Sequence, residues 1–293
     1  MELELKGVTK TYPNGVKALD DVSLTIPRGM FGLLGPNGAG KSSLMRSVAT
    51  LQLIDAGTMR FDGIDIAKEP DRLRDVLGYL PQDFGVYPKV SAFDMLDHLA
   101  QLKGLSKPSE RRQVVDALLQ RTNLWEHRSK RLGGFSGGMK QRFGIAQALI
   151  GNPKLIIVDE PTAGLDPAER ARFHNLLSEI GEDVVVLLST HIVSDVADLC
   201  AKMAILAGGK VILTGSPTDL MEQLQGRVWS KFVSAADLEA LSKELPVIAV
   251  RRVSGQRLVH VFAEKQPRGE FAQVRPDLED VYFQSLSASQ KAA

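Results

Sequence analysis

The segment from Gly35 to Ser42 has the residue types and the spacing of a phosphate-binding loop. It reads Gly-Pro-Asn-Gly-Ala-Gly-Lys-Ser, a glycine and four further residues before Gly-Lys-Ser. Glycines let the backbone curl so that its N–H groups point at phosphate oxygens, and a helix beginning near Gly40 adds the positive end of its dipole. Lys41 can then reach the β and γ phosphates of a nucleotide, while Ser42 offers its hydroxyl oxygen to Mg2+. The predicted nucleotide-binding residues of this loop are Gly35, Pro36, Asn37, Gly38, Ala39, Gly40, Lys41, Ser42 and Ser43.

Two adjacent acids, Asp159 and Glu160, follow the aliphatic run Leu155–Val158. Ligands of open α/β sheets bind at the carboxyl ends of the strands, so these acids are expected beside the phosphate loop. Asp159 is predicted to hold Mg2+ through a water molecule, and Glu160 to accept a proton from the attacking water. The alternative, charges that end a buried strand before Pro161, would be favoured if the strand stood alone.

A serine and two glycines, Ser136-Gly137-Gly138, stand at the start of a predicted helix and form a second candidate anion-binding helix terminus. With this feature the sequence resembles the ATP-binding cassette (ABC) family, whose signature has a Ser-Gly-Gly core after the phosphate loop. The resemblance covers roughly residues 1–225. It implies that Ser136, Gly137 and Gly138 contact a nucleotide.

Four further residues match family positions in the expected order. The resemblance implies that Tyr12 stacks on adenine, that Gln82 touches the metal or the attacking water, and that His191 contacts the γ phosphate. It also implies that Asp166, in the loop Ala163–Asp166, crosses a dimer interface. Taken singly, the same residues could be an edge-strand aromatic, a surface amide, a strand-end histidine and a helix cap.

The resemblance implies a motor built from two copies of the chain. Each of two ATP molecules would lie between the phosphate loop of one copy and Ser136 of the other. Glu160, His191 and Gln82 would be catalytic, Ser42, Gln82 and Asp159 would hold Mg2+, and closure on ATP would move a partner. That partner would be a separate membrane permease, and the chain would lie in the cytoplasm on the inner face of the cell membrane.

Two departures from the commonest family pattern point to a subgroup. Phe135 and Met139 replace the first and last residues of the usual Leu-Ser-Gly-Gly-Gln signature, while its Ser-Gly-Gly core is intact. The tail Pro276–Phe283 resembles the C-terminal end of bacterial export-type cassettes. Export is therefore the expected direction of transport. The segment Phe84–Pro88 is the expected contact with the permease, although packing of the neighbouring helices would explain Phe84 equally well.

Changes in hydrophobic periodicity divide the chain into a cassette and an appendage. The first thirty residues alternate as antiparallel strands around the turns at Pro13–Gly15 and Pro27–Gly29. Residues 84–150 have mainly helical spacing, with a Ser91/Asp94 capping pair. We expect a cassette over residues 1–225 with a helical insert over about 84–150. The appendage over 226–293 is expected to contain three short strands, 228–233, 247–253 and 258–262.

Within the cassette, the elements that position the chemistry are strands and their following helices. Residues 30–34, 155–159 and 184–189 read as buried strands, while 41–50, 167–180 and 217–225 read as helices. The expected fold is α/β: a P-loop NTPase core of mainly parallel sheet, an N-terminal antiparallel β subdomain, the helical insert, and the small C-terminal α+β appendage.

The composition of the chain argues against several classes of function. The 293 residues carry a formal net charge of +1, so no overall positive field attracts nucleic acid. The longest apolar runs are far below the ~18 residues that cross a bilayer, and Met1–Lys6 lacks a targeting core. Cys200 is expected to be a small buried apolar residue. The arginine pairs at Arg111 and Arg251 are expected on solvated faces.

Two other functions fit some of the same motifs. Soluble cassette proteins that act on ribosomes or DNA are disfavoured, because this chain has one cassette and no long coiled coil between the phosphate loop and Ser136. A regulatory cassette that binds ATP without hydrolysing it is disfavoured because Glu160 and His191 are both present.

Overall fold

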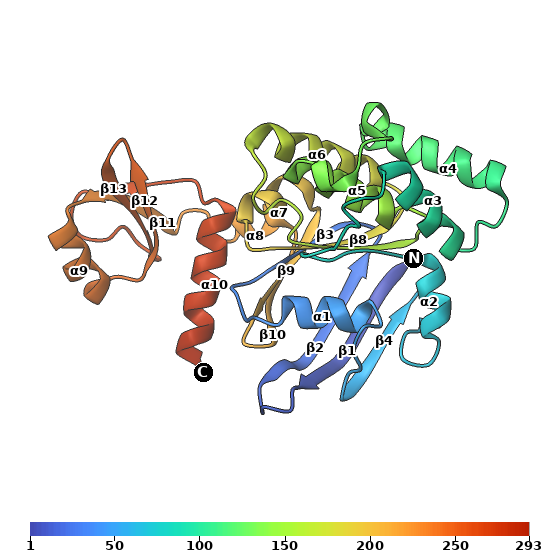
Figure 1. Cartoon of the computed structure of the whole chain (residues 1–293). Coiled ribbons are helices and arrows are strands. Elements are labelled where there is room, and N and C mark those ends of the chain that lie inside the picture. Colours follow the sequence, from blue (N-terminus) through green and yellow to red (C-terminus); the bar gives the residue numbers. More distant parts are fainter. Residues whose placement is uncertain (293) are drawn as a thin grey trace.

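The computed structural model describes residues 1–292, which form three β-sheets with helices packed around them (Figure 1). The first sheet is antiparallel and has the order β2-β1-β4-β5. Its strands are β1 (Glu2–Thr11), β2 (Lys17–Pro27), β4 (Ala56–Phe61) and β5 (Ile64–Asp65). Leu3, Leu5 and Val8 of β1 are buried while residues between them are more exposed, as the alternation in sequence predicts.

The central sheet has six strands in the order β10-β9-β3-β8-β7-β6. They are β3 (Gly29–Leu34), β6 (Leu77–Leu80), β7 (Leu155–Asp159), β8 (Val185–Thr190), β9 (Lys202–Ala207) and β10 (Lys210–Gly215). All neighbours pair in parallel except the edge strand β10. The carboxyl ends of β3, β7 and β8 therefore meet at one edge of the sheet, where ligands of such folds bind.

Most helices cover the central sheet on one side, whereas the helix over Lys41–Val48 lies with the antiparallel sheet on the other (Figure 1). The helices of the cassette are α1 (Lys41–Val48), α2 (Pro70–Val76), α3 (Ala92–Leu102), α4 (Pro108–Arg121), α5 (Gly137–Ala148), α6 (Pro167–Gly181), α7 (Val193–Leu199) and α8 (Pro217–Glu222). Short 3-10 turns occupy Trp125–His127 and Leu132–Gly134. Met30 and Leu34 of β3 join the buried cluster under α3–α7, whereas Phe31 and Leu33 join the cluster with α1.

The predicted α/β fold is confirmed, and several helix ends follow from local chemistry. Ser91 caps α3 by accepting a hydrogen bond from the Asp94 N–H at 3.1 Å, as the capping pair predicts. Helix α8 ends at Glu222, three residues before the predicted end, because the next residues turn more tightly: the N–H groups of Leu224 and Gln225 donate to carbonyls three residues back, at 3.1 and 3.0 Å. Cys200 is buried as expected, and burial raises the pKa of its thiol to about 12.

The residues after α8 build a third sheet with the order β12-β13-β11-β14. Its strands are β11 (Val228–Val233), β12 (Val247–Val253), β13 (Gln256–Phe262) and β14 (Ala272–Gln273). Helix α9 (Ala235–Glu244) joins β11 to β12 and was not predicted, and α10 (Leu278–Ala292) follows the sheet. In Figure 1 this sheet projects to the left of the cassette, with α10 between the two.

The tail that begins α10 joins the appendage to the cassette. Leu278 and Val281 are buried in the apolar cluster that includes α7 and α8. From the appendage, the Arg251 guanidinium donates two hydrogen bonds to Asp277, at 2.6 and 2.8 Å, and His260 Nδ1 lies 2.8 Å from Asp280. The expectation of a solvated Arg251 was therefore wrong, because its acidic partners lie in α10 and its N-terminal turn. Arg111 likewise pairs with Asp97 and is largely buried.

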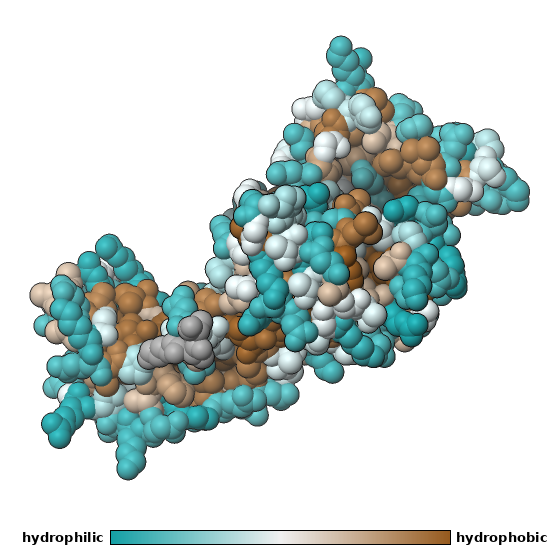
Figure 2. Space-filling model, turned by 90° about the horizontal axis from the view of Figure 1, so that it is seen from below, coloured by the Kyte–Doolittle hydropathy of each residue, from teal (hydrophilic) through white to brown (hydrophobic). Residues whose placement is uncertain are grey.

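The surface carries exposed apolar side chains on the appendage. Figure 2 shows apolar surface over the appendage and at its junction with the cassette, bordered by hydrophilic residues. The exposed large apolar residues of this part are Phe232, Val250, Val253 and Phe283. Over residues 1–292, no helix has both the length and the apolar character that crossing a membrane requires.

Candidate functional site

The phosphate loop connects β3 to α1 and needs glycine at several positions for steric reasons. Gly40, at the N-cap of α1, has φ 107°, and a methyl group there would lie 2.3 Å from the carbonyl oxygen of Ala18. A methyl group at Gly35 would lie 2.4 Å from the Leu206 carbonyl oxygen. The loop can therefore adopt its tight path only with glycine at these two positions. This path leaves the first N–H groups of α1 free for an anion.

Lys41 places a buried positive charge inside the loop. Its ammonium donates hydrogen bonds to the carbonyl oxygens of Gly35 at 2.7 Å and Pro36 at 3.2 Å, and it is only 6% exposed. Burial lowers the pKa of Lys41, while Glu160, 3.9 Å away, opposes that shift. A phosphate in the loop would satisfy this charge better than neutral carbonyl groups do, because charge-assisted hydrogen bonds are the stronger ones.

Glu160 lies at the centre of the predicted catalytic group. Its backbone has a left-handed conformation with φ 46°, held by a 2.9 Å hydrogen bond from its N–H to the Ser189 carbonyl. Non-glycine residues in this conformation are strained and gather at functional sites. One carboxylate oxygen lies 3.1 Å from Nδ1 of His191 and accepts a 3.4 Å hydrogen bond from Nε2 of Gln82. The structure thus brings all three predicted catalytic side chains together.

Asp159 provides a buried carboxylate beside Glu160. It is 4% exposed, and one oxygen, Oδ1, has no hydrogen-bond partner within the described residues. Burial raises the pKa of Asp159, against the nearby hydroxyl groups of Ser189 and Ser42, which lower it. An unpartnered carboxylate oxygen close to the Ser42 hydroxyl suits Mg2+, which prefers oxygen ligands.

The protein groups at this place supply only part of a metal's coordination shell. Within residues 1–292 no cluster of three or more His, Cys, Asp or Glu side chains could hold a metal ion by itself. Mg2+ keeps several waters and is usually bound by one or two protein oxygens together with the phosphates of a nucleotide. Asp159 and Ser42 therefore fit a metal that arrives with ATP.

Acid is expected to weaken Mg2+-dependent nucleotide binding at a pH above the range in which an ordinary aspartate titrates. Mg2+ needs the ionised form of Asp159, and burial raises its pKa from 3.8. Below the raised pKa the carboxyl group is neutral and its hold on the metal is lost; above that pKa the hold is complete. The measurement is the affinity for an ATP analogue with and without Mg2+, from about pH 8 to about pH 5.

Asp159→Asn is the matched control for that titration, because protonation of the nucleotide itself affects both proteins equally. The variant should show little Mg2+-dependent gain in affinity at any pH. If Asp159→Asn keeps the full Mg2+-dependent gain of the unmodified chain, Asp159 does not hold the metal.

A cavity of about 690 Å3 lies in front of the loop, a size suited to a small-molecule ligand. Its lining residues are Tyr12, Val16, Ala18, Asn37, Gly38, Ala39, Gly40, Lys41, Ser42, Ser43, Gln82, Glu160, Ala163 and His191. The Tyr12 hydroxyl lies 3.0 Å from Ser43 Oγ and donates a 3.1 Å hydrogen bond to Gln52. Val16, Ala18 and Ala163 were not predicted from the sequence, because small apolar residues carry no chemical signal.

The remaining predicted site residues lie outside this cavity. Ser136 is exposed at the N-cap of α5, where its hydroxyl accepts a 3.2 Å hydrogen bond from the Met139 N–H. Asp166 is exposed at the N-cap of α6 and accepts a 2.8 Å hydrogen bond from the Glu169 N–H. Gly138 is buried, and a methyl group there would lie 2.4 Å from the carboxylate of Glu169, which would have to move. Within one chain, these residues and Gly137 do not line the cavity that holds Lys41 and Glu160.

Comparisons with known proteins agree with this geometry. A family model described as ABC transporter matches residues 19–163. The ABC transporter ATP-binding protein NatA of Bacillus subtilis (strain 168) is 36% identical over 210 residues, which cover 71% of this chain and 85% of NatA. The probable multidrug ABC transporter ATP-binding protein YbhF of Escherichia coli (strain K12) is 36% identical over 228 residues, which cover 77% of this chain. That match covers 39% of YbhF, so this chain spans less than half of that relative's length.

A solved structure with the same fold is a dimer. It is the ATP-binding cassette MJ0796 in a post-hydrolysis state bound to ADP and Pi. The TM-score is 0.67 at 28% sequence identity, and the match covers 73% of this chain and 98% of that one.

Proposed function

This chain belongs to the ATP-binding proteins of ABC transporters, a family of ATPases, and we propose that it hydrolyses ATP with Mg2+ to power export through a separate membrane permease. One observation carries the proposal: the Glu160 carboxylate, which lies beside Lys41, contacts both Gln82 and His191. A steady-state ATPase assay tests it, since a cassette that only binds ATP would show no turnover.

The residues divide the work of hydrolysis among them. The loop N–H groups and Lys41 bind the phosphates and neutralise charge on the γ phosphate. Glu160 accepts the proton of the attacking water, Gln82 helps to position that water, and His191 contacts the γ phosphate. Ser42 and Asp159 hold Mg2+, which when bound offsets negative charge on the β and γ phosphates. Tyr12 offers its ring to the adenine.

Two copies of the chain are proposed to close over two ATP molecules. Ser136 is exposed, caps a helix whose N-terminus can bind an anion, and lies outside the cavity of its own chain. A second copy brought to the cavity would supply Ser136, Gly137 and Gly138 to the nucleotide. Asp166 is exposed on a loop that continues from the cavity residue Ala163. The dimeric cassette MJ0796 supports this arrangement.

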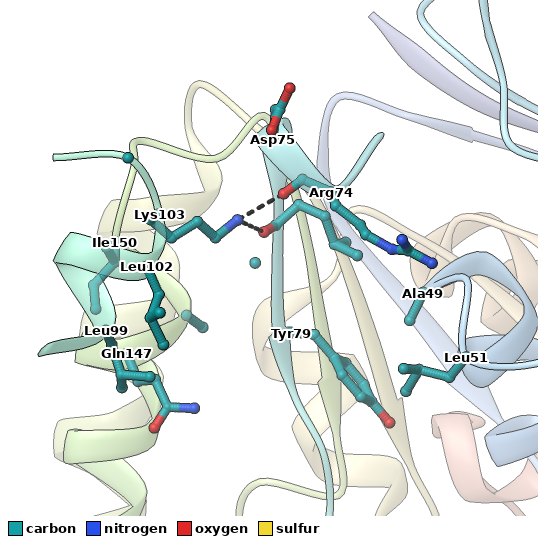
Figure 3. A pocket seen from close by; sticks show the side chains of 14 residues that line it. Ala49, Leu51, Arg74, Asp75, Tyr79, Leu99, Leu102, Lys103, Gln147 and Ile150 are labelled. Atoms are coloured by element: carbon teal, nitrogen blue, oxygen red, sulfur yellow. Dashed lines mark hydrogen bonds between the residues drawn. The ribbon is translucent and has the colours of Figure 1, made fainter. Parts of the chain in front are cut away.

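The proposed docking surface for the permease includes a groove between the core and the helical insert. Figure 3 shows Leu51 and Tyr79 on one side of this groove and Leu99 and Leu102 on the other. Its volume is about 620 Å3. Across it, the Lys103 ammonium donates hydrogen bonds to the carbonyl oxygens of Arg74 at 2.6 Å and Leu77 at 3.0 Å, and burial lowers the pKa of Lys103.

The groove residue Tyr79 precedes the segment that the sequence predicts as the permease contact, Phe84–Pro88, by five residues. Tyr79 precedes Gln82 by three residues, so movement at the groove can reach the catalytic site through one strand end. Tyr87 is exposed and free to contact a partner. Phe84 instead packs at Gly144 of α5, where a methyl group would lie 2.8 Å from its ring. We propose that a cytoplasmic segment of the permease lies in the groove and contacts Tyr87.

Leu102→Glu is expected to abolish association with the permease while leaving ATP turnover of the isolated chain unchanged. Leu102 lines the groove and is 71% exposed, so its replacement adds a charge to the docking surface without disturbing the core. The measurement is recovery of a membrane-spanning protein with the tagged chain from detergent-solubilised membranes, identified by mass spectrometry.

Leu53→Glu is the matched control. Leu53 is 78% exposed and equally apolar, but it does not line the groove. This variant should retain the membrane partner. Equal recovery of the partner by both variants would contradict the proposed docking surface.

The direction of transport, the location and the division of the chain form the finer part of the proposal. Export is supported by Phe135 and Met139 in the signature, by the tail Pro276–Phe283, and by the multidrug name of the relative YbhF. The chain is proposed to act at the cytoplasmic face of the membrane, where ATP is available to it. Residues 1–225 are proposed to be the motor, and 226–293 an appendage whose apolar surface contacts a partner.

A further inference from the structure

Asp195 is a buried carboxylate that links several segments around the catalytic site. It lies on α7 and is 0% exposed. Its Oδ2 accepts hydrogen bonds from Thr162 at 2.5 Å and from Thr190 at 3.4 Å. Its Oδ1 accepts a 2.7 Å hydrogen bond from Nε of Arg170 and lies 2.8 Å from Nε2 of His174. Both oxygens are thus fully used, as burial of a charge requires.

The partners of Asp195 belong to the segments that carry the proposed catalytic and dimer-facing residues. Thr162 lies between Glu160 and the loop Ala163–Asp166. Thr190 immediately precedes His191, and its hydroxyl also accepts a 3.0 Å hydrogen bond from the Ile192 N–H. One carboxylate therefore fixes the start of the dimer-facing loop and the backbone that presents His191.

The other two partners lie on the helix that follows the same loop. Arg170 and His174 are on α6, whose N-cap is Asp166. The Arg170 guanidinium supplies the positive charge that offsets the buried carboxylate, and it also donates a 2.6 Å hydrogen bond to Ser194. The loop Ala163–Asp166 is in this way held at both ends by the same acid, through Thr162 before it and through α6 after it.

We propose that Asp195 is a positioning residue that couples the loop Ala163–Asp166 to His191. The proposal rests on the function proposed above, in which that loop meets a second copy of the chain. Thr162 and Asp195 hold Thr190 so that His191 lies beside Glu160 already in the single chain. Contact of the loop with a second copy then acts on the position of His191 through these hydrogen bonds. Asp195 is fully buried and does not line the cavity, so its effect is on the geometry of the residues that do.

Thr162→Val tests the coupling, because it removes one hydroxyl and preserves the branched shape of the side chain. We expect kcat to fall about tenfold with little change in KM for ATP, since nucleotide binding uses other residues. Thr162→Ser, which keeps the hydroxyl, should restore kcat. Thr122→Val is the control for removing a buried hydroxyl, since Thr122 is 1% exposed and bonds the Leu118 carbonyl away from the cavity.

A second variant, Thr190→Val, and the double variant test whether the two hydroxyls act through the same acid. Their effects on kcat should be non-additive, because each disturbs the same carboxylate. The inference is overturned if Thr162→Val keeps the kcat of the unmodified chain, if its loss equals that of Thr122→Val, or if Thr162→Ser loses as much. An unmodified chain without turnover would instead overturn the proposed function.

Discussion

Replacing Glu160 by glutamine is expected to keep ATP binding, remove turnover and accumulate a dimer. Glutamine has nearly the size of glutamate and can still contact Gln82 and His191, which lie 3.4 and 3.1 Å from the carboxylate. It cannot accept the proton of the attacking water, so kcat should fall by about 10²–10⁴-fold. The phosphate loop is unchanged, so ATP remains bound and holds the two copies closed.

The measurement combines ATP hydrolysis with sedimentation in the presence of ATP and Mg2+. Glu182→Gln is a suitable control, because Glu182 is exposed just after the end of α6, and its backbone carbonyl, not its side chain, accepts a hydrogen bond from Arg28. That variant should hydrolyse ATP normally and show no extra dimer. If Glu160→Gln stays monomeric with ATP and Mg2+, the two-copy arrangement is wrong for the isolated chain. Continued turnover would exclude Glu160 as the proton acceptor.

The parts of the fold that depend on neighbouring residues could be predicted from the sequence. The aliphatic run Leu155–Val158 forms a strand because a parallel strand is buried on both faces, and the acids after it must then reach the sheet edge. The Ser91/Asp94 pair starts α3 because a serine hydroxyl satisfies a free N–H of the first turn. The phosphate loop is predictable for the same reason: its geometry follows from its own glycines.

Features that depend on distant partners could not be predicted. Arg251 looked like a surface residue because its partner Asp277 lies 26 positions along the chain. Asp195 gave no signal, since its oxygens are satisfied by Thr162 and Thr190 only once two strand ends meet. Helix α9 is a different case, because local signals for it are present: Ser234 caps its first turn, and Leu238 and Leu241 have helical spacing. It could have been predicted from the sequence.

The left-handed backbone of Glu160 also could not be predicted from the sequence. The sequence Asp159-Glu160-Pro161 does not predict a left-handed backbone at Glu160, because glutamate rarely adopts this conformation. The hydrogen bond to the Ser189 carbonyl, which comes from the next strand, fixes it. The sequence therefore predicts a glutamate as the proton acceptor, whereas the sheet decides that its carboxylate faces Gln82 and His191.

Two inactive variants are expected to restore turnover when they are mixed. Lys41→Ala removes the buried charge of the phosphate loop, and Ser136→Asp places a negative charge where a second copy would meet the γ phosphate. Aspartate is as good an N-cap as serine, so α5 keeps its cap. Each variant alone should lose turnover by about 10²-fold or more, because each removes a group that stabilises charge in the transition state.

The recovery of ATP turnover in the mixture follows from a site that two chains share. In a hybrid dimer, the intact Lys41 of one copy faces the intact Ser136 of the other, so one of the two sites is complete. About half of the dimers in an equal mixture are hybrids, so the mixture should hold about a quarter of the normal number of complete sites. Ser136→Thr, which keeps a hydroxyl and no charge, is the control and should remain active by itself. Different tags on the two variants verify that hybrids form. If hybrids form and turnover stays absent, Lys41 and Ser136 do not complete one site between two chains. The exposed position of Ser136 would then not reflect a contact with the nucleotide of a second copy.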